Sequence, residues 1–414
     1  MLKVVVIADD FTGALDTAVQ FVQQGIATQV FINSHFDRTE VNKETEVLVI
    51  DTESRPLAKE EAYQEVQKVA KWAMDEGVKI IYKKTDSALR GNVGMELQAI
   101  TDLAGDMPLY FIPAYPEIKR ITKEGIHYIG TEKISESVFG KDPYEPVRHS
   151  FIPDIIKEQS EVETKCISPK EDLPTQKSEI VICDVLTVAD MDSRVSSLMS
   201  NQKLMFVGGC ASLANAIARL GIFKRKEKKE PQRTTGLYVG CGSLNEITKK
   251  QVLYATERGF KRINLKAKQK FEINYYKTEE GKNFLEKIVQ YCKKEHRIIV
   301  DSFNEEKEEC NNKMEHRENI AKAHGQIVKK IVESKVDFTI LMTGGDTLMG
   351  YMKLINCSQL EPICELEQGV VVSNIKVKGK NQQVISKSGG FGTEDVFCRI
   401  ANKIIKEEKN NEER

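Results

Sequence analysis

The sequence predicts an α/β protein with two domains, each containing a mainly parallel sheet flanked by helices. Short apolar runs rich in β-branched residues alternate with amphipathic helical patterns, as they do in parallel sheets, whose strands need long crossover connections. The chain has 414 residues, of which 40% are hydrophobic, and this length is enough for two or three domains of ordinary size. A charge-dense stretch near residue 230 interrupts the alternation once, so we predict two domains.

The first domain is predicted to begin with a strand that leads directly into a helix. This helix begins near Thr12 and carries apolar residues at helical spacing until Gly25, a typical helix terminator. A second amphipathic helix at 59–75 ends before Gly77 in the same way. The predicted strands of this domain are residues 2–8, 28–32, 47–51, 79–83, 109–113, 180–184 and 204–208.

Residues 225–235 are predicted to form an interdomain linker, because they are densely charged, contain Pro231 and lack apolar periodicity. This places one domain at 1–224 and the other at 236–414. The second domain repeats the alternating pattern. Its predicted strands are residues 236–240, 262–265, 298–300 and 338–342, and its predicted helices are 245–258, 281–294, 315–333 and 393–405.

The overall composition excludes several classes of partner. The 61 Lys and Arg residues balance 62 Asp and Glu residues, so no global field favours nucleic acid or an anionic membrane. The first apolar run is too short for a signal peptide, and no run approaches the roughly 18 apolar residues of a spanning helix. The nine cysteines include no Cys-x-x-Cys pair, which argues against a disulfide framework or a structural zinc site. We therefore expect a cytoplasmic protein that binds small molecules, with no nucleic acid and no membrane, and with a homodimer as the commonest closed assembly.

Polar residues follow the predicted strands of the first domain, at the edge where open α/β sheets bind ligands. Asp9 and Asp10 stand side by side after the first strand, and their repulsion must be offset by a ligand, a cation or helix-terminal amides. A helix N-cap would explain Asp10 but not Asp9. Arg55 follows the third strand and is predicted to grip a carboxylate bidentately.

A third polar segment follows the strand at 79–83. Its mixture of cations, hydroxyls and a carboxylate suits a polar, anionic small molecule such as a carboxylate-bearing sugar. An ordinary solvated run of charges is the alternative interpretation. The residues concerned are Lys84, Thr85, Asp86, Ser87 and Arg90.

The second domain contains three glycine-rich turns, each between a predicted strand and a helix. No P-loop sequence is present, and Gly240-Cys241-Gly242 lacks the third glycine of a dinucleotide fingerprint. Bare backbone before a helix N-terminus still favours phosphate, and three such turns favour a nucleotide, although each alone could be an ordinary tight turn. The candidate nucleotide-binding residues are Ser243, Gly344, Gly345, Asp346, Thr347, Gly389 and Gly390.

Six short segments, spread in order along most of the chain, form a recognisable set. They are Ile-Ala-Asp-Asp-Phe-Thr-Gly-Ala at 7–14, Lys-Lys-Thr-Asp-Ser-Ala-Leu-Arg-Gly-Asn at 83–92, Pro-Ala-Tyr-Pro at 113–116 with Arg120 and Gly125, Asp-Pro at 142–143, Thr-Gly-Gly-Asp-Thr at 343–347 and Lys-Ser-Gly-Gly-Phe-Gly-Thr-Glu-Asp at 387–395. Together they resemble the four-carbon acid sugar kinase family. The resemblance implies an N-terminal substrate-binding domain and a C-terminal nucleotide-binding domain. It implies ATP-dependent phosphorylation of the terminal 4-hydroxyl of threonate, erythronate or a 3-oxo-tetronate, without selecting among these acids.

The resemblance also implies where the two substrates bind. Mg²⁺ that bridges the phosphates is the expected cofactor beside ATP, and its protein ligands are not assigned. Matched by motif, the acid-sugar contacts are Asp10, Arg55 and residues 84–87, with Asp9 beside them, and the ATP contacts are Ser243, residues 344–347 and Gly390.

Phosphoryl transfer needs an in-line hydroxyl, charge neutralisation and a base or orienting acceptor. Asp86 or Asp10 is predicted to accept the hydroxyl proton, while Lys84 and Arg90 offset negative charge. Asp346 is a competing base, because a Gly-Gly-Asp helix start is able to present a carboxylate to a γ-phosphate, in a way similar to ribokinase-like sugar kinases. Two alternatives stay open: a hydroxy-acid dehydrogenase that uses the first glycine-rich turn, and a non-catalytic sensor of the same ligands.

Overall fold

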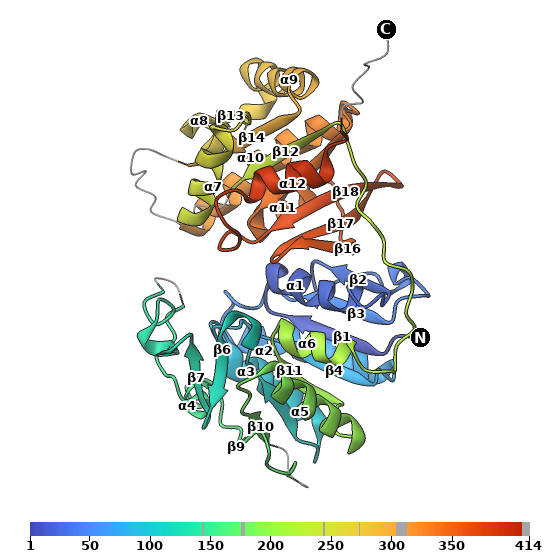
Figure 1. The fold of residues 1–414 in the computed structure, drawn as a ribbon, viewed down its shortest axis with the longest axis vertical. Helices are drawn as coiled ribbons and strands as arrows, with labels where there is room; N and C mark the ends of the chain where they lie inside the picture. The colour runs from blue at the N-terminus through green and yellow to red at the C-terminus, as the bar shows by residue number, and fades with distance from the viewer. Residues whose placement is uncertain (143–144, 175–178, 243–244, 273, 304–312, 408–414) are drawn as a thin grey trace. The chain divides into compact units, whose positions relative to one another are not determined.

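A computed structural model describes residues 1–414 apart from 143–144, 175–178, 243–244, 273, 304–312 and 408–414 (Figure 1). The chain folds into two compact units, Met1–Lys228 and Lys229–Arg414. The division between them falls inside the charged segment 225–235. Both units combine a mainly parallel sheet with flanking helices, which confirms the predicted fold class.

The sheet of the first unit is parallel throughout its described strands, in the order β2-β3-β1-β4-β11-β5-β10-β9. Its central strands are aliphatic and buried on both faces, as expected where helices cover both sides. After β3 the chain passes to the other side of β1 to form β4, and ligands of open α/β sheets bind at such a switch point. The strands are β1 (Val4–Ala8), β2 (Thr28–Phe31), β3 (Val47–Asp51), β4 (Ile80–Lys84), β5 (Leu109–Ile112), β9 (Thr164–Ile167), β10 (Ile180–Cys183) and β11 (Phe206–Gly209).

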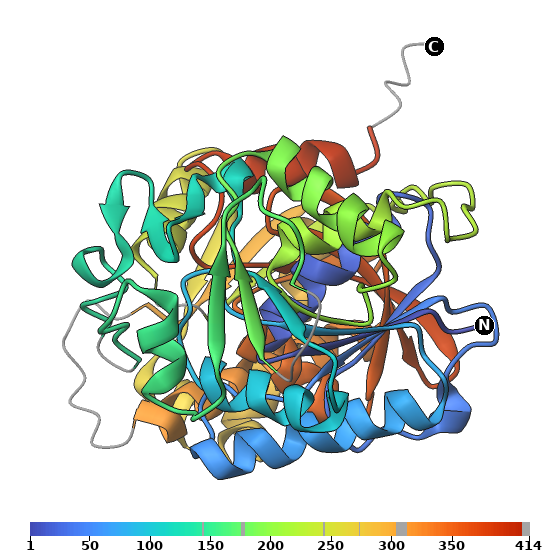
Figure 2. The same ribbon diagram turned by 90° about the horizontal axis from the view of Figure 1, so that it is seen from below.

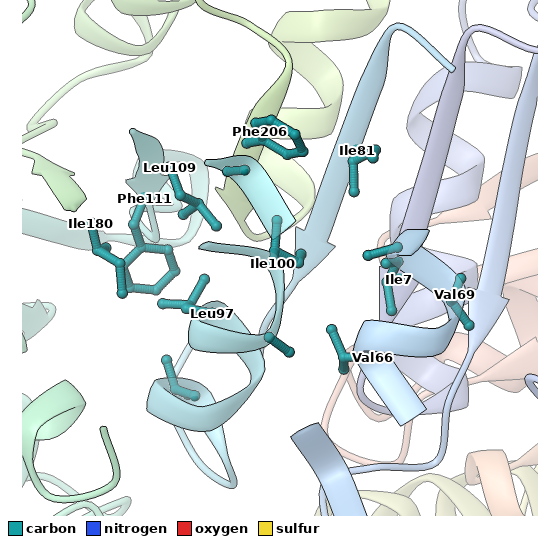
Figure 3. Close-up of a cluster of buried hydrophobic side chains, with 14 of the residues drawn as sticks. Ile7, Val66, Val69, Ile81, Leu97, Ile100, Leu109, Phe111, Ile180 and Phe206 are labelled. Atoms are coloured by element: carbon teal, nitrogen blue, oxygen red, sulfur yellow. The ribbon is translucent and has the colours of Figure 1, made fainter. Parts of the chain in front are cut away.

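Helices cover both faces of this sheet (Figure 2). α1, α5 and α6 pack together on one face, while α2 and α3 pack together on the other, with α4 beside α3. The apolar side chains of α2 and α3 share one core with the strands, which includes Ile7, Leu97, Phe111 and Phe206 (Figure 3). This core gives the strand ends a rigid base. The helices are α1 (Phe11–Val22), α2 (Lys59–Asp75), α3 (Val93–Ala104), α4 (Ile152–Lys157), α5 (Val188–Ser200) and α6 (Ala211–Ala218).

A small antiparallel sheet, which was not predicted from the sequence, follows β5. It consists of β6 (Arg120–Lys123), β7 (Ile126–Ile129) and β8 (Glu132–Lys133). The turn between β6 and β7 has left-handed backbone at Glu124 and Gly125, as in a tight hairpin. Short 3₁₀ turns of this unit lie at Arg38–Glu40, Pro116–Ile118 and Ile134–Glu136.

The sheet of the second unit has the order β13-β14-β12-β15-β18-β17-β16 in the described residues. The strands β13, β14, β12, β15 and β18 run parallel, whereas β16, β17 and β18 form an antiparallel meander that was not predicted. The strands are β12 (Gly236–Cys241), β13 (Lys261–Asn264), β14 (Arg297–Asp301), β15 (Phe338–Thr343), β16 (Gln359–Glu367), β17 (Val370–Val377) and β18 (Lys380–Lys387).

Helices also flank this second sheet. α7 and α12 pack together over one core, and α10 packs against α8, α9 and α11. The last helix begins at Val396, three residues later than predicted. No helix in the described part of the chain is both long and apolar enough to span a bilayer. The helices are α7 (Glu246–Thr256), α8 (Ala267–Phe271), α9 (Glu279–Lys294), α10 (Lys313–Glu333), α11 (Gly345–Leu354) and α12 (Val396–Ile404), with a 3₁₀ turn at Tyr275–Lys277.

Candidate functional site

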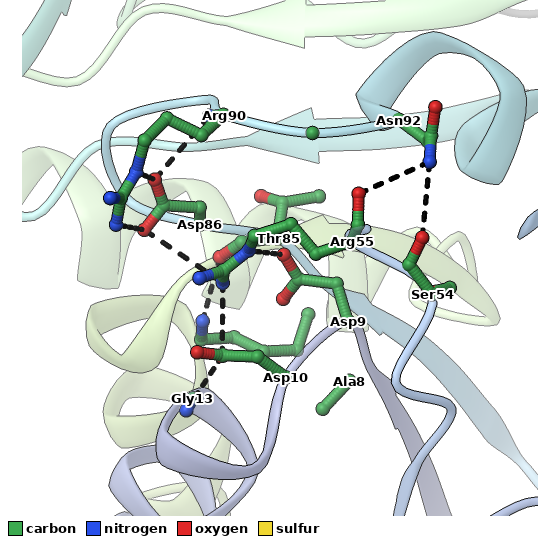
Figure 4. A network of polar contacts seen from close by, with 12 residues as sticks. Ala8, Asp9, Asp10, Gly13, Ser54, Arg55, Thr85, Asp86, Arg90 and Asn92 are labelled. Carbon is green, nitrogen blue, oxygen red and sulfur yellow. Dashed lines mark hydrogen bonds and ion pairs between the residues drawn. The ribbon is translucent and has the colours of Figure 1, made fainter. Parts of the chain in front are cut away.

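Polar residues singled out from the sequence converge at the carboxyl ends of β1, β3 and β4 (Figure 4). Asp9 and Asp10 follow β1, Arg55 lies in the loop after β3, and Lys84 is the last residue of β4. The register brings them together, because the last residue of β1 pairs with the last residues of both β3 and β4. The switch point of the sheet therefore carries a charged cluster.

Arg55 is the centre of this cluster. Its Nε donates a hydrogen bond to Asp9 Oδ2 at 2.8 Å, and its Nη2 lies 2.9 Å from Asp10 Oδ1 and 4.0 Å from Asp86 Oδ1. The second oxygen of Asp9, Oδ1, is buried and has no hydrogen-bond partner among the described residues. One guanidinium thus lies within 4.0 Å of three carboxylates.

A second guanidinium, that of Arg90, holds Asp86 bidentately. Arg90 Nε donates to Asp86 Oδ2 at 2.6 Å, and Nη2 donates to Oδ1 at 3.3 Å. The remaining nitrogen, Nη1, reaches Asp142 Oδ2 at 3.4 Å. Paired donors of this kind fix geometry as well as charge, so Asp86 is held in place between two arginines.

These contacts set the ionisation of the cluster. Burial would raise the pKa of Asp9 and of Asp86, but the neighbouring cations together outweigh it: Arg55, Lys83 and Lys84 at Asp9, and Arg55, Arg90 and Lys84 at Asp86. Both pKa values therefore lie below the usual range. Burial would lower the pKa of Arg55, but its carboxylate neighbours outweigh burial and raise it. All of these groups therefore carry their charges at neutral pH.

Two residues of the segment at 83–92, Gly91 and Asn92, contact the loop that carries Arg55. Asn92 Nδ2 donates to the carbonyl oxygens of Ser54 at 3.0 Å and Leu57 at 2.9 Å. Gly91 has a φ of 85°, and a Cβ at this position would lie 2.8 Å from Arg55 Cγ. The backbone thus passes directly over Arg55 at a position that favours glycine in both conformation and space.

Beneath the cluster, Lys83 forms a fully buried ion pair with Glu96. Lys83 Nζ lies 3.1 Å from Glu96 Oε2 and donates to the carbonyls of Ile7 at 3.2 Å and Lys84 at 2.8 Å, which uses all three protons of the amine. The other oxygen of Glu96 accepts from the Ser54 hydroxyl. Glu96 was not predicted from the sequence, although a lysine inside a buried strand is itself a signal that an anion is near. The pair ties β1, β4 and α3 together under the strand ends.

Lys84 and Asp10 lie at the N-terminus of α1. Asp10 caps this helix, because its Oδ1 accepts from the Gly13 N–H at 2.9 Å. Lys84 Nζ donates to the Thr85 carbonyl at 2.7 Å, and a Cβ at Gly13 would lie only 2.7 Å from the same amine. Glycine thus leaves room for the amine beside helix-terminal N–H groups, an arrangement that favours an anion.

The two hydroxyl residues of the same loop face different partners. Thr85 is fully buried, and its hydroxyl donates to the Gly209 carbonyl at 3.4 Å. Ser87 accepts from Nη1 of Arg120, and its carbonyl lies 3.1 Å from Nε2 of His127. Thr85 therefore turns into the sheet, while Ser87 connects the loop to the small antiparallel sheet.

In the second unit, two predicted glycine turns lie at the carboxyl ends of β15 and β18. Gly344 has a φ of 86°, precedes α11 as its N-cap, and donates through its N–H to the Lys387 carbonyl at 2.9 Å. Thr347, in the first turn of α11, donates to the Thr343 carbonyl at 2.9 Å. A Cβ at Gly242 would lie 2.3 Å from Thr347 Oγ1, so the turn after β12 closely approaches the start of α11.

The other predicted nucleotide-binding residues at the carboxyl ends of β15 and β18 are less closely packed. Gly345 begins α11, and Asp346 is exposed in its first turn. The Gly389 carbonyl accepts from Thr248 Oγ1 at 2.9 Å, whereas a Cβ at Gly390 would meet nothing closer than 4.0 Å. The backbone at this last glycine therefore faces open space.

Two buried polar residues that were not among the predicted site residues support these turns. Gln251 of α7 donates to the carbonyls of Phe391 and Gly392 at 3.0 and 2.9 Å. Lys387, the last residue of β18, donates to the carbonyl of the next residue at 2.9 Å, and burial lowers its pKa to about 8. The position of Lys387 at the end of an apolar strand was a signal in the sequence that its side chain is buried near the turn. The predicted Ser243 lies outside the described residues.

No group of three or more His, Cys, Asp or Glu side chains is arranged to hold a metal ion in the part of the chain that the structure describes. A Mg²⁺ ion bound through nucleotide phosphates needs only one or two protein carboxylates. This observation therefore does not test the prediction that Mg²⁺ binds together with ATP.

Comparison with known proteins divides the chain in a similar way. Residues 4–217 match the family of sugar-binding N-terminal domains, and residues 238–397 match the family of nucleotide-binding C-terminal domains. A D-threonate kinase of Salmonella typhimurium is 24% identical over 426 residues, which cover 96% of this chain and 97% of the relative. A D-erythronate kinase of Heliobacterium modesticaldum is 32% identical over 207 residues, which cover 47% of each chain. The crystal structure of a proposed tRNA synthase from Salmonella typhimurium LT2 covers 98% of this chain and 99% of its own at a TM-score of 0.82 and 18% identity, and so shares the fold.

We predict that acid destabilises the first unit through His127, which lies buried behind the Ser87 carbonyl. Burial lowers the pKa of His127 to about 4, whereas an unfolded histidine has a pKa of about 6.5. The unfolded state therefore binds the proton first, and the free energy of unfolding should fall by up to about 3 kcal/mol as the pH drops from about 6.5 to about 4. Urea unfolding across this pH range measures the slope.

The variant His127→Gln keeps a hydrogen-bonding side chain but takes up no proton. Its stability should depend less steeply on pH than that of the wild type between these values. The exposed His149 provides a matched control, and His149→Gln should keep the wild-type slope. Equal slopes for the wild type and His127→Gln would rule out this source of acid sensitivity.

Proposed function

The chain belongs to the four-carbon acid sugar kinase family, and on this premise we propose that it transfers the γ-phosphoryl group of ATP to the terminal 4-hydroxyl of a four-carbon acid sugar. The observation that carries the proposal is the convergence of Asp10, Arg55, Lys84 and Asp86 in the unit that matches sugar-binding domains. The glycine-rich edge of the unit that matches nucleotide-binding domains gives further support. The candidate acids are threonate, erythronate and 3-oxo-tetronate.

We assign the acid sugar to the edge formed by Asp9, Asp10, Arg55 and residues 84–87. Sugar hydroxyls need both acceptors and donors, and this edge offers both. Asp9 Oδ1 is a buried acceptor without a partner among the described residues, and the Lys84 amine is a donor beside a helix N-terminus. A buried group that lacks its hydrogen bond supports a role in binding a ligand.

Asp10 fits the role of the base better than Asp86 does. Two guanidiniums hold the pKa of Asp86 below its usual range, which makes this carboxylate a poor proton acceptor. The side chain of Asp10 is 30% exposed, and its Oδ2 has no partner among the described residues. Lys84 would offset charge on the transferring group, and Arg90 would act by holding Asp86. Asp346 stays the alternative base.

We propose that ATP binds along the glycine-rich edge of the second unit, at residues 344–347, Gly389, Gly390 and Ser243. The N-terminus of α11 and the open backbone at Gly390 support an anion there. Mg²⁺, bound mainly through phosphate oxygens, would neutralise phosphate charge. The dehydrogenase alternative is set aside, because relatives of the chain are named as kinases. A cytoplasmic location and a homodimeric assembly remain predictions.

The proposed function is tested by measuring ADP release from ATP and Mg²⁺ with D- and L-threonate, D-erythronate and 3-oxo-tetronates. Phosphorus NMR should then show a phosphomonoester at the terminal carbon of one acid. Binding of ATP without turnover on any acid would contradict the kinase proposal for these substrates and favour the sensor alternative.

We predict that Asp10→Asn lowers kcat by about 100- to 10,000-fold, the range expected for loss of a general base. Asparagine still caps a helix well, so the change removes the proton acceptor and keeps the cap. Steady-state kinetics at saturating substrates measure the effect, with the exposed Asp37→Asn as a control of wild-type activity. A wild-type kcat for Asp10→Asn would transfer the role of base to Asp346, which the corresponding Asp346→Asn variant then tests.

We predict that Gly91→Ala raises the KM for the acid sugar by about tenfold and leaves the KM for ATP unchanged. The added Cβ would displace Arg55, from which it would lie only 2.8 Å. Gly105→Ala is the matched control, because Gly105 also has a positive φ, 62°, but a Cβ there meets no atom within 4 Å. Both variants place a side chain at a positive φ and should lose stability from backbone strain. Similar KM values for the acid in both variants would mean that the contact with Arg55 is unimportant.

A further inference from the structure

Arg120 differs from the other arginines of the acid-sugar edge because it has no carboxylate of its own. It begins β6, is half-buried, and donates through Nη1 to the Ser87 hydroxyl. Its guanidinium carbon lies 4.9 Å from the centre of the Phe139 ring, a cation–π contact that orients the group. Among the residues that the structure describes, no carboxylate forms an ion pair with Arg120.

The neighbouring arginines have already been neutralised by the protein. Arg55 contacts Asp9 and Asp10 through two nitrogens, and Arg90 grips Asp86 bidentately. A ligand carboxylate at either of them would have to compete with these built-in anions. Their geometry therefore suits the positioning of aspartates better than the capture of a new carboxylate.

The electrostatics around Arg120 leave its charge only partly compensated by the chain itself. Burial lowers the pKa of Arg120, and the like charge of Arg90 lowers it further, although Asp86 opposes both. The direct contacts of this partly buried cation are a neutral hydroxyl and an aromatic ring, and Asp86, which favours its charge, forms its ion pair with Arg90, so the hydration lost by Arg120 is not fully restored. A carboxylate ligand would restore it.

We infer that Arg120, rather than Arg55, binds the carboxylate of the acid sugar. This inference rests on the proposed function and names the group that recognises the acidic end of the substrate. On this inference the small antiparallel sheet positions the residue that binds the carboxylate, because β6 carries Arg120 and β7 carries His127, which contacts the same Ser87.

The assignment sets the direction of the substrate in the site. Lys84 Nζ donates to Thr85, and Arg120 donates to Ser87, two residues farther along the same loop. The Cα atoms of residues two apart lie at most about 7 Å from each other, so one short loop receives the contacts of both cations. With the carboxylate at Arg120, we expect the terminal hydroxyl to lie toward Lys84 and Asp10. The acid is thereby selected over a neutral sugar, because a ligand without the carboxylate leaves the guanidinium unpaired.

The test compares Arg120→Met with the wild type in kinetics and in direct binding. Loss of a bidentate, charge-assisted contact should lower kcat/KM for the acid on the order of 100-fold, while the KM for ATP stays unchanged. Calorimetric titration with the acid in the absence of ATP should show the same loss of affinity. The primary amide of the acid, which lacks the charge, should bind the wild type and the variant equally. The discrimination between acid and amide should therefore disappear in Arg120→Met.

Arg38→Met is the matched control, because Arg38 also lies over an aromatic ring, 5.5 Å from the centre of Trp72, but is exposed and remote from the acid-sugar edge. It should behave as the wild type. If Arg120→Met does not fold, Arg120→Lys serves instead, and it should recover part of the affinity, since it keeps the charge but not the fork. An affinity for the acid within twofold of the wild type, or equal losses for acid and amide, would overturn the inference.

The binding measurement separates this inference from the proposed function. If the wild type binds an acid sugar but transfers no phosphoryl group, the proposed function fails, and the comparison of Arg120→Met with the wild type still decides the role of Arg120. If the wild type binds none of the acids, the inference is wrong.

Discussion

Charge compensation at the carboxyl edge of the first sheet is the constraint on which the rest of the site depends. The side chains of Asp9 and Asp86 are buried, and burial alone would raise their pKa values toward protonation. Contacts with Arg55 and Arg90 keep both ionised and fix the two guanidiniums at the same time. Removal of one partner from a buried pair leaves an uncompensated charge, which typically costs about 3–5 kcal/mol. These groups are therefore held in position by their contacts with one another.

Charge compensation also holds beneath the strand ends, where Lys83 lies in β4, a strand that is buried on both faces. Its amine is satisfied by Glu96 and two backbone carbonyls, so β1, β4 and α3 are held together beneath the strand ends. The next residue, Lys84, points to the other side of the sheet because side chains alternate along a strand, and it reaches the N-terminus of α1. Two adjacent lysines thus have different tasks, since one holds the scaffold and the other faces the proposed acid-sugar edge.

The convergence of polar residues could be predicted from the sequence because it depends on only three strands, each followed directly by its polar motif. The small sheet β6–β8 and the meander β16–β18 could not, since their tight hairpins lack the Asn-Gly or Asp-Gly signal. Lys378 and Gly379, with φ of 48° and 77°, turn β17 into β18 without either signal. The contact of Arg120 with Ser87 depends on the missed sheet. Glu96 could be matched to its lysine only once the packing of α3 was known.

The balance of charge at the proposed acid-sugar edge limits how phosphoryl transfer is able to proceed there. The carboxylates of Asp9, Asp10, Asp86 and Asp142 lie at this edge with the cations Arg55, Arg90, Arg120 and Lys84, and Glu145 lies close enough that Arg55 and Arg90 favour its charged form. An acid sugar adds a further negative charge to these carboxylates, and a phosphoryl group adds more. The arginines that are already paired cannot neutralise the surplus without releasing their aspartates. On the proposed mechanism, Mg²⁺ bound with the nucleotide would supply positive charge for the transferring phosphoryl group.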